Sequence, residues 1–227
     1  WQLWDDAHWD ASERSAPGRP RTVRLADGGT LDLDGATAVD IAYGTSERLL
    51  RLRSGQILVQ TAADTMYPAR PLRVATEHGR MQALGTRFNV RVTERGTQMA
   101  VLEGAVLIEP GGRRGDARRI DAGQQAWFDL TGVRAPHPLD PGVSDWLHGM
   151  LVADNLPLGE LIGRLAEQNG GMLRCDPAVA HLPISGAWPL HDPDRSLAML
   201  EATLPVRVRR HAGGLWTRVE AAPSRQR

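Results

Sequence analysis

The sequence predicts a mainly β protein with an N-terminal all-β domain, of solenoid-like or twisted-sheet form, followed by a small α+β domain. Three observations predict this fold class. Between residues 22 and 130, short runs of alternating apolar and polar residues are separated by glycines, a pattern typical of half-buried strands joined by turns. A segment rich in Pro and Gly follows at 131–145. Apolar residues at helical spacing appear only after residue 146.

The composition of the 227-residue chain is that of an ordinary globular protein, with 41% hydrophobic and 24% charged residues. Lys plus Arg and Asp plus Glu both total 27, so the formal net charge is zero. This balance argues against a general binder of nucleic acid or of anionic membranes, which would carry a basic excess. The single cysteine, Cys175, excludes an intrachain disulfide and a cysteine-based zinc cluster.

Residues 1–21 are predicted to form a membrane-proximal tether. This segment is polar apart from Leu3 and three tryptophans, Trp1, Trp4 and Trp9. Tryptophan rings suit a membrane interface, or they pack on the domain that follows, and the pattern alone leaves both open. The chain begins with Trp and contains no run of 18 apolar residues. We therefore expect a fragment of a longer protein, without a membrane span of its own.

Residues 22–130 are predicted to form stacked β units. Four strand–glycine–strand segments have their turns at Gly28, Gly55, Gly79 and Gly104, which follow one another at intervals of 24–27 residues. Glycine supplies the positive φ of tight hairpin turns, so each glycine is expected to close a hairpin. A regular interval of this size favours solenoid-like or twisted-sheet stacking.

Two side chains of this region are predicted to lie in its core. Leu84, Gly85 and Thr86 are expected to form a tight corner within one β unit. Alternation after that corner points Phe88 and Val90 inward, where an aromatic ring contributes strongly to stability.

The segment 131–145 is predicted to be a linker between two domains. Its three prolines can continue neither a helix nor a central strand, and it holds few large apolar residues. A second domain is expected at 146–220, and a short tail at 221–227.

The α+β domain is predicted to fold in the order β-α-β-β-α-β-β, as two βαβ-like halves with both helices on one small sheet. One helix is expected at 157–168, where apolar residues recur at i, i+3, i+4 and i+7. The other is expected at 193–203, with Asp192 or Asp194 as its N-cap. A hairpin over Gly213-Gly214 closes the domain.

No group of residues has the spacing of a known catalytic or metal site. The seven histidines form neither HxH nor HExxH, and neither GxSxG nor GxxxxGK[ST] occurs. Cys175 and His181 come nearest to a nucleophilic pair. Cys175 lies in a predicted core strand, however, where a lone cysteine usually acts as a small hydrophobe. The sequence therefore predicts a protein that is not an enzyme and that uses no cofactor and no metal.

Short sequence motifs in both domains stand in the same order as in the proteins of a known family. The β region contains VRLADG (23–28), RPLRVAT (70–76), QALGTRFNV (82–90), VLEGAV (101–106) and DAGQ (121–124). The second domain contains WLHG (146–149), NLPL (155–158), ISG (184–186) and LAML (197–200). The first set resembles the core of the FecR family, the transmembrane anti-sigma regulators of iron-siderophore signalling in Gram-negative bacteria. The second resembles the C-terminal part of these proteins, which is similar to the secretin/TonB short N-terminal (STN) domain. In one departure, Leu72 stands where the family more often has phenylalanine.

The resemblance implies the periplasmic part of a single-pass inner-membrane protein that serves cell-surface signalling. Its partner would be the N-terminal signalling domain of a TonB-dependent outer-membrane siderophore receptor. A cytoplasmic part outside this chain would bind an extracytoplasmic-function sigma factor. Because the family passes its signal through regulated proteolysis, this chain would be a substrate of periplasmic and intramembrane proteases. The implied role is transcription regulation in iron transport, without nucleic-acid binding by this chain.

The candidate partner-binding residues lie in the closing strands of the second domain. Val206 and Val208 alternate with Arg207, Arg209 and Arg210, which predicts a strand with an apolar side and a cationic side. The arginines suit an acidic partner, and the open edge of a small sheet suits an added partner strand. A solvated outer face is the alternative.

Aromatic residues bear on this function and on a rival one. Trp188 and Trp216 are candidate interface anchors, or else core residues. The rival function is a β-solenoid glycan- or cell-wall-binding module, which needs a row of exposed aromatics for sugars to stack on. The aromatics between 22 and 130 are too few and irregular for such a row: Tyr43, Tyr67, Phe88, Trp127 and Phe128.

Overall fold

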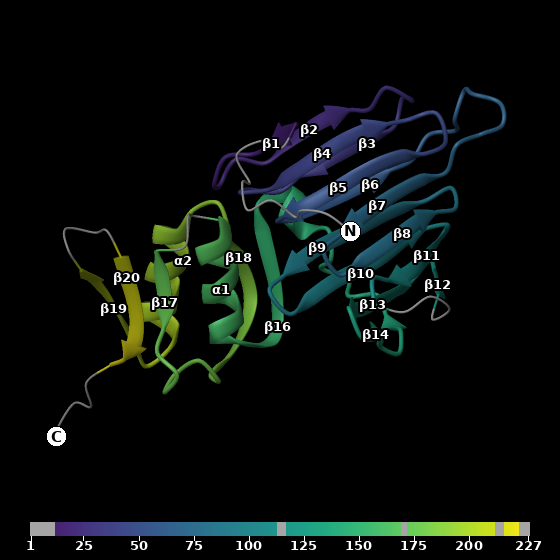
Figure 1. Cartoon of the computed structure of the whole chain (residues 1–227). Coiled ribbons are helices and arrows are strands. Elements are labelled where there is room, and N and C mark those ends of the chain that lie inside the picture. The colour runs from purple at the N-terminus through teal and green to yellow at the C-terminus, as the bar shows by residue number, and fades with distance from the viewer. Residues whose placement is uncertain (1–11, 113–116, 169–171, 212–215, 223–227) are drawn as a thin grey trace, which may run out of the picture. The chain divides into compact units, whose positions relative to one another are not determined.

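The chain divides into two units, the first made mainly of residues up to Ser144 and the second of residues from Asp145 (Figure 1). A computed structural model describes residues 12–112, 117–168, 172–211 and 216–222. Strands are the main regular structure of the described chain, which confirms the mainly β fold class. The tryptophans of the predicted tether and the Gly213-Gly214 turn lie outside the described residues.

The first unit contains two β-sheets, sheet A and sheet B. Sheet A consists, in spatial order, of β1 (Glu13–Arg14), β4 (Ala38–Tyr43), β5 (Arg48–Ser54), β7 (Leu72–Thr76), β8 (Gly79–Ala83), β11 (Ala105–Pro110) and β12 (Arg118–Asp121). Sheet B consists of β14 (Gly132–Val133), β13 (Gln124–Asp129), β10 (Gly96–Glu103), β9 (Arg87–Thr93), β6 (Gln56–Gln60), β3 (Thr30–Leu33) and β2 (Arg21–Arg24), with β15 (His137–Pro138) also paired to β13. In both sheets the strands stand in the order in which the chain visits them.

The two sheets share one buried core, because alternate side chains of each strand point between them. Phe88 and Phe128 are its largest members and are fully buried. The burial of Phe88 and Val90 confirms the predicted inward positions. The other core residues come from both sheets and, for Leu25, from the turn after β2: Leu25, Leu31, Leu33, Val39, Leu50, Leu52, Ile57, Val59, Leu72, Val74, Met81, Met99, Val101, Val106, Ile108, Ile120 and Ala126.

The solenoid part of the prediction is not confirmed. Successive coils of a parallel solenoid would place neighbouring strands in parallel. In the described part of this unit, neighbouring strands pair antiparallel, with β5 and β7 as the parallel exception. The regular glycine interval therefore does not mark the coils of a solenoid.

Half of the predicted glycine hairpins are in fact corners between the sheets. Gly28 and Gly79 do lie in hairpins, β2–β3 and β7–β8. Gly55 instead joins β5 of sheet A to β6 of sheet B, and Gly104 joins β10 of sheet B to β11 of sheet A. Their φ values of +88° and +75° turn an almost continuous strand out of one sheet and into the other. The expected corner at Leu84–Thr86 is confirmed, since Gly85 there has φ +73° and joins β8 to β9.

Replacing Gly104 with Ala should lower the free energy of unfolding by about 2–5 kcal/mol. A Cβ at Gly104 would lie 2.1 Å from the backbone oxygen of Gly85. Overpacking of this kind costs about 1–3 kcal/mol, and the left-handed backbone adds about 1–2 kcal/mol for a residue with a side chain. Gly123→Ala is the matched control, because Gly123 has φ +82° but its Cβ would meet nothing within 4 Å. Urea denaturation of both variants measures the difference, and equal losses would contradict the proposed clash.

Two segments predicted to be irregular contain strands of the first unit. β1, within the predicted tether, pairs with β4, so the tether is shorter than expected. β14 and β15, within the predicted linker, both pair with β13. Proline is tolerated at an edge strand, where its missing N–H breaks no ladder bond, and this explains Pro138 in β15.

The second unit has the predicted order of elements. It consists of a 3-10 helix (Asp145–His148), β16 (Met150–Pro157), α1 (Leu158–Gln168), β17 (Leu173–Cys175), β18 (Pro183–Pro189), α2 (Pro193–Thr203), β19 (Val206–His211) and β20 (Trp216–Ala221). Asp192 caps α2, since its carboxylate accepts the backbone N–H of Arg195 at 3.0 Å. Neither described helix is long and apolar enough to cross a membrane.

The strands of the second unit form two sheets, where one was predicted. β16 pairs with β18, and β17, β20 and β19 form a separate sheet in that order. Both helices lie between these sheets, α1 against β16 and β17 and α2 against β18 and β19 (Figure 1). Each helix can therefore bury apolar residues on two sides, which a single covering sheet would not provide.

Candidate partner-binding surface

The predicted binding strand is β19, which lies at the edge of its sheet. It pairs antiparallel with β20, and His211 stands opposite Trp216 at the end of the pair. We define the β19 surface as residues 206–211 together with Trp216. The structure thus brings six of the seven candidate residues into one pair of strands, whereas Trp188 lies in β18 of the other sheet.

The two faces of β19 differ in part from the prediction. Val206 is buried and Val208 is half-buried, while Arg207 and Arg209 are exposed. Arg210 was assigned to the cationic side, but side chains alternate along a strand, so Arg210 falls on the same face as the valines. There it forms an ion pair of 2.6 Å with Asp194 of α2.

The remaining arginines of the surface differ in their ion pairs. The Arg209 guanidinium lies 2.5 Å from the Glu220 carboxylate of β20. Arg207 has no ion pair with any residue in the described ranges. The Arg209 and Arg210 side chains are both solvent-exposed, so each of their ion pairs contributes at most about 1 kcal/mol to stability. Arg207 is therefore the arginine of this surface that is most available to a partner.

The two candidate anchor tryptophans have different environments. Trp216 is 37% exposed, and its ring stacks on His211 with centroids 3.9 Å apart and planes 8° from parallel. Trp188 is 4% exposed, which fits the core alternative rather than a surface anchor. Of the two, Trp216 presents an aromatic ring at the surface.

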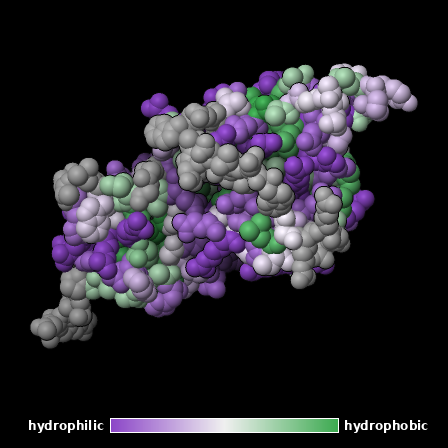
Figure 2. Space-filling view, viewed as in Figure 1, coloured by the Kyte–Doolittle hydropathy of each residue, from purple (hydrophilic) through white to green (hydrophobic). Residues whose placement is uncertain are grey.

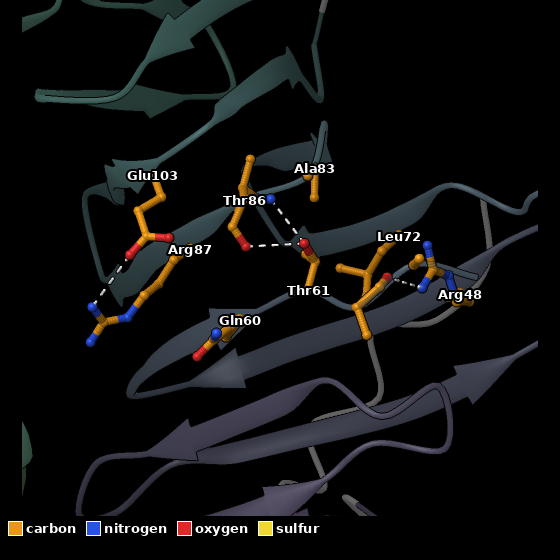
Figure 3. Close-up of a pocket in the computed structure, with 11 residues that line it drawn as sticks. Arg48, Gln60, Thr61, Leu72, Ala83, Thr86, Arg87 and Glu103 are labelled. Atoms are coloured by element: carbon orange, nitrogen blue, oxygen red, sulfur yellow. Dashed lines mark hydrogen bonds and ion pairs between the residues drawn. The ribbon is translucent and has the colours of Figure 1, made fainter. Parts of the chain in front are cut away.

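A depression of about 370 Å³ lies in the first unit, where strands of both sheets end (Figure 3). The hydroxyl of Thr61 accepts the backbone N–H of Thr86 at 2.8 Å and donates to the Thr86 carbonyl at 3.1 Å. Arg87 and Glu103 form a loose ion pair of 3.8 Å nearby. The lining contains no His, Cys, Ser or Lys, and its hydroxyl and carboxylate groups are those of Thr61, Thr86 and Glu103.

A buried ion pair holds together the loops beside this depression. Arg48 donates to the Asp27 carboxylate at 2.6 Å, and their side chains are 8% and 1% exposed. The same guanidinium donates to the carbonyls of Ala62 at 3.0 Å and Arg70 at 3.1 Å. Tyr43 donates its hydroxyl to Asp27, and burial, with the Asp27 charge second, raises the pKa of Tyr43. The polar groups of Asp27, Arg48 and Tyr43 thus form hydrogen bonds with one another.

A second ion pair closes the base of the loop between β6 and β7. Asp64 accepts two bonds from the Arg70 guanidinium, each 2.9 Å, and one from the Arg70 backbone N–H at 2.7 Å. Arg70 also donates to the Gly44 carbonyl at 2.8 Å. These hydrogen bonds from Arg70 hold the pKa of Asp64 well below its usual range. At the tip of the loop, Tyr67 is fully exposed.

The Asp64–Arg70 ion pair should make the free energy of unfolding depend on pH in the acidic range. The pKa of Asp64 is lower in the folded chain than its ordinary value of 3.8. The stabilisation that the ionised Asp64 side chain provides is therefore fully present above about pH 3.8. It is lost as the pH falls from 3.8 towards the depressed pKa of the folded state. The difference in unfolding free energy between wild type and Asp64→Asn should therefore be constant above about pH 5 and shrink below it. Denaturation from pH 2.5 to 7 measures this, and parallel pH curves would contradict it.

Cys175 and the histidines form no reactive site among the residues that the structure describes. Cys175 is half-buried in β17, and burial, with the Asp176 charge second, raises the pKa of its thiol. A raised pKa disfavours the reactive thiolate. Across the described ranges, no group of three or more His, Cys, Asp or Glu side chains could hold a metal ion.

Exposed aromatic residues are also scarce. In the described chain, Tyr67 and Trp216 are the large aromatic residues classed as exposed. Figure 2 shows one face of the molecule, which is mainly hydrophilic with small separate hydrophobic patches. The row of stacking platforms that a glycan-binding module needs is therefore not found in the described residues.

Comparison with known proteins gives a family match and a shared fold. Residues 11–107 match the family model FecR, described as FecR protein. Two crystal structures of a candidate anti-sigma factor from Parabacteroides distasonis ATCC 8503 have TM-scores of 0.75 and 0.76 at 19% and 20% identity. They cover 93% of this chain, which in turn covers 98% and 99% of theirs. At this identity the likeness concerns fold alone, and no curated protein matches the chain.

Proposed function

We propose that this chain is the signal-transducing region of an anti-sigma regulator. The proposal rests on the FecR match over residues 11–107, which bears out the resemblance seen in the sequence. Its site of action is the periplasm, as part of a single-pass inner-membrane protein. The fold shared with the candidate anti-sigma factor from Parabacteroides distasonis supports this role over most of the chain. The family match is the observation that carries the proposal.

The partner on the receptor side is the N-terminal signalling domain of a TonB-dependent siderophore receptor. The second unit provides most of the surface for it, centred on the β19 surface. Arg207 supports this choice, since it is exposed and has no ion pair in the described part of the chain. An exposed cation at a strand edge attracts an acidic partner and speeds encounter.

The chain itself performs no chemistry in this proposal. Binding at the receptor side changes the susceptibility of the regulator to periplasmic and intramembrane proteases. Cleavage then changes what a cytoplasmic part of the same protein does to its sigma factor. The folded units described here act as binding partner and protease substrate.

Reversing the charge of Arg207 should slow association with the cognate signalling domain. Long-range attraction acts on the encounter rate, so Arg207→Glu should reduce the association rate about three- to tenfold and weaken its dependence on salt. Dissociation should change less. Stopped-flow mixing of 1–227 with the purified signalling domain at two salt concentrations measures both rates.

Arg24→Glu is the matched control, because Arg24 is also an exposed arginine on an edge strand but belongs to the first unit. Its association rate should stay within about twofold of wild type. Equal slowing by both variants would contradict the choice of the β19 surface. Absence of binding by wild-type 1–227 would contradict the receptor-binding role.

A further inference from the structure

The edge of β19 that faces away from β20 carries backbone groups that can bind another strand. Val208 donates its N–H to a side chain of α2 and Val206 donates to the Leu204 carbonyl, so neither donates to β20. Backbone direction alternates along a strand, which places the N–H of Arg210 on the same outer edge. This edge therefore has a row of outward N–H groups at every second residue.

One of these donors is already occupied by a carboxylate. Glu201 of α2 accepts the Val208 N–H at 2.7 Å through its Oε1 atom. Two helical turns earlier, Asp194 pairs with the Arg210 side chain at 2.6 Å. α2 thus supplies two acidic side chains to the strand. Because the Val206 N–H donates to the Leu204 carbonyl, an added strand would use the N–H groups of Val208 and Arg210, and Glu201 occupies that of Val208.

From these contacts we propose that the outer edge of β19 is a docking site for an acidic extended segment, and that Glu201 keeps it closed. The proposal deepens the receptor-binding role proposed above and rests on it for the natural occupant. Opening the site costs one charge-assisted hydrogen bond at the surface, a modest barrier. The apparent affinity for the segment is reduced in proportion to the fraction of molecules in which Glu201 leaves the edge free.

The charges of β19 indicate an acidic occupant. On the β20 side of the strand, Glu220 already pairs with Arg209. An added strand with acidic residues at alternate positions would place them beside Arg207 and Arg209 in the same way. A second copy of β19 would instead set arginines against arginines, which is unfavourable. The charges thus favour an acidic segment over self-association.

The test uses 1–227 and a synthetic probe, an acetylated and amidated octapeptide that alternates Glu with Thr. In wild type, the peptide should shift the amide NMR signals of residues 206–211 at high concentration. Glu201→Ala should bind it about tenfold more tightly, a gain of about 1.4 kcal/mol. The amide hydrogen of Val208 should also exchange faster in this variant, because its acceptor is gone.

Asp194→Ala is the matched control, since Asp194 contacts the side chain of Arg210 and no backbone donor of β19 in the described residues. Its affinity for the peptide should stay within about twofold of wild type. A second variant, Glu201→Ala with Arg210→Pro, removes another outward N–H and should lose the gain, with folding checked from the NMR spectrum. Proline at an outward position of an edge strand leaves the bonds to β20 intact.

Equal affinity of wild type and Glu201→Ala would overturn the proposal, as would shifts centred outside residues 206–211. If a peptide with Lys in place of Glu bound as tightly as the Glu peptide, the preference for an acidic segment would be overturned. Dimerisation of Glu201→Ala without peptide binding would identify a second copy of the chain as the occupant. The titration contains no receptor domain. If the peptide binds as expected while the receptor domain does not, the receptor-binding role fails and the docking site stands.

Discussion

Replacing Arg48 with Met should lower the free energy of unfolding by about 3–5 kcal/mol, the usual cost of removing one partner from a buried ion pair. The Asp27 carboxylate, 1% exposed, would remain buried without its cation. The carbonyls of Ala62 and Arg70 would also lose their donor. Met keeps much of the side-chain volume, so the loss reflects polar groups left unpaired. Urea denaturation of the variant measures it.

A surface ion pair provides the control for this experiment. Arg21 donates to Glu13 at a similar distance, 2.7 Å, but its side chain is 48% exposed. Arg21→Met should therefore cost at most about 1 kcal/mol. If Arg48→Met cost no more than Arg21→Met, the buried pair would not hold the loops together as described.

Replacing Phe88 with Ala should cost about 3–5 kcal/mol, the range for emptying an aromatic core site. The Phe88 side chain is fully buried between the two sheets. It lies in β9, in the middle of sheet B, so the cavity would be surrounded by strands that cannot easily close it. Denaturant unfolding measures the loss. Tyr67→Ala is the control, because a fully exposed aromatic should contribute less than about 0.5 kcal/mol.

A loss below 1 kcal/mol for Phe88→Ala would contradict the core assignment, since it falls well under the range for a buried aromatic. A large loss for Tyr67→Ala would point instead to a folded-state contact of the loop tip. The two variants together separate burial from aromatic character.

Local patterns in the sequence predicted the secondary structure well. The two helices were expected at 157–168 and 193–203 and are found at Leu158–Gln168 and Pro193–Thr203. Apolar spacing and an N-cap carboxylate are local signals, and helix bonds are local too. The inward position of Phe88 followed in the same way from strand alternation.

The arrangement of strands into sheets could not be predicted in the same way. The alternation of apolar and polar residues predicts which side chains of a strand are buried, but it does not predict which other strand pairs with it. A glycine with positive φ looks the same in a hairpin, as at Gly79, and in a corner between sheets, as at Gly104. For this reason, two sheets were taken for a stack of hairpins, and β14 and β15 for a linker.

The candidate site was predicted in part. The sequence located β19 and its arginines, but strict alternation should have placed Arg210 with the valines. The contact of Glu201 with the Val208 backbone depends on how α2 lies against β19, which no local pattern reveals. The same is true of Arg48 and Asp27, which are 21 residues apart. A single sequence does not contain the pairing of such distant charges.

The order of the strands has a consequence for how the first unit comes apart. Both sheets are traversed in chain order, so the strands at the two ends of the first unit are also the edge strands of its sheets. A pull on either end of this unit therefore acts first on the outermost strands of the two sheets, and the remaining strands still form two smaller sheets. Such a unit can be unravelled stepwise from an end, as a processive protease requires, with no strand drawn out from between two others.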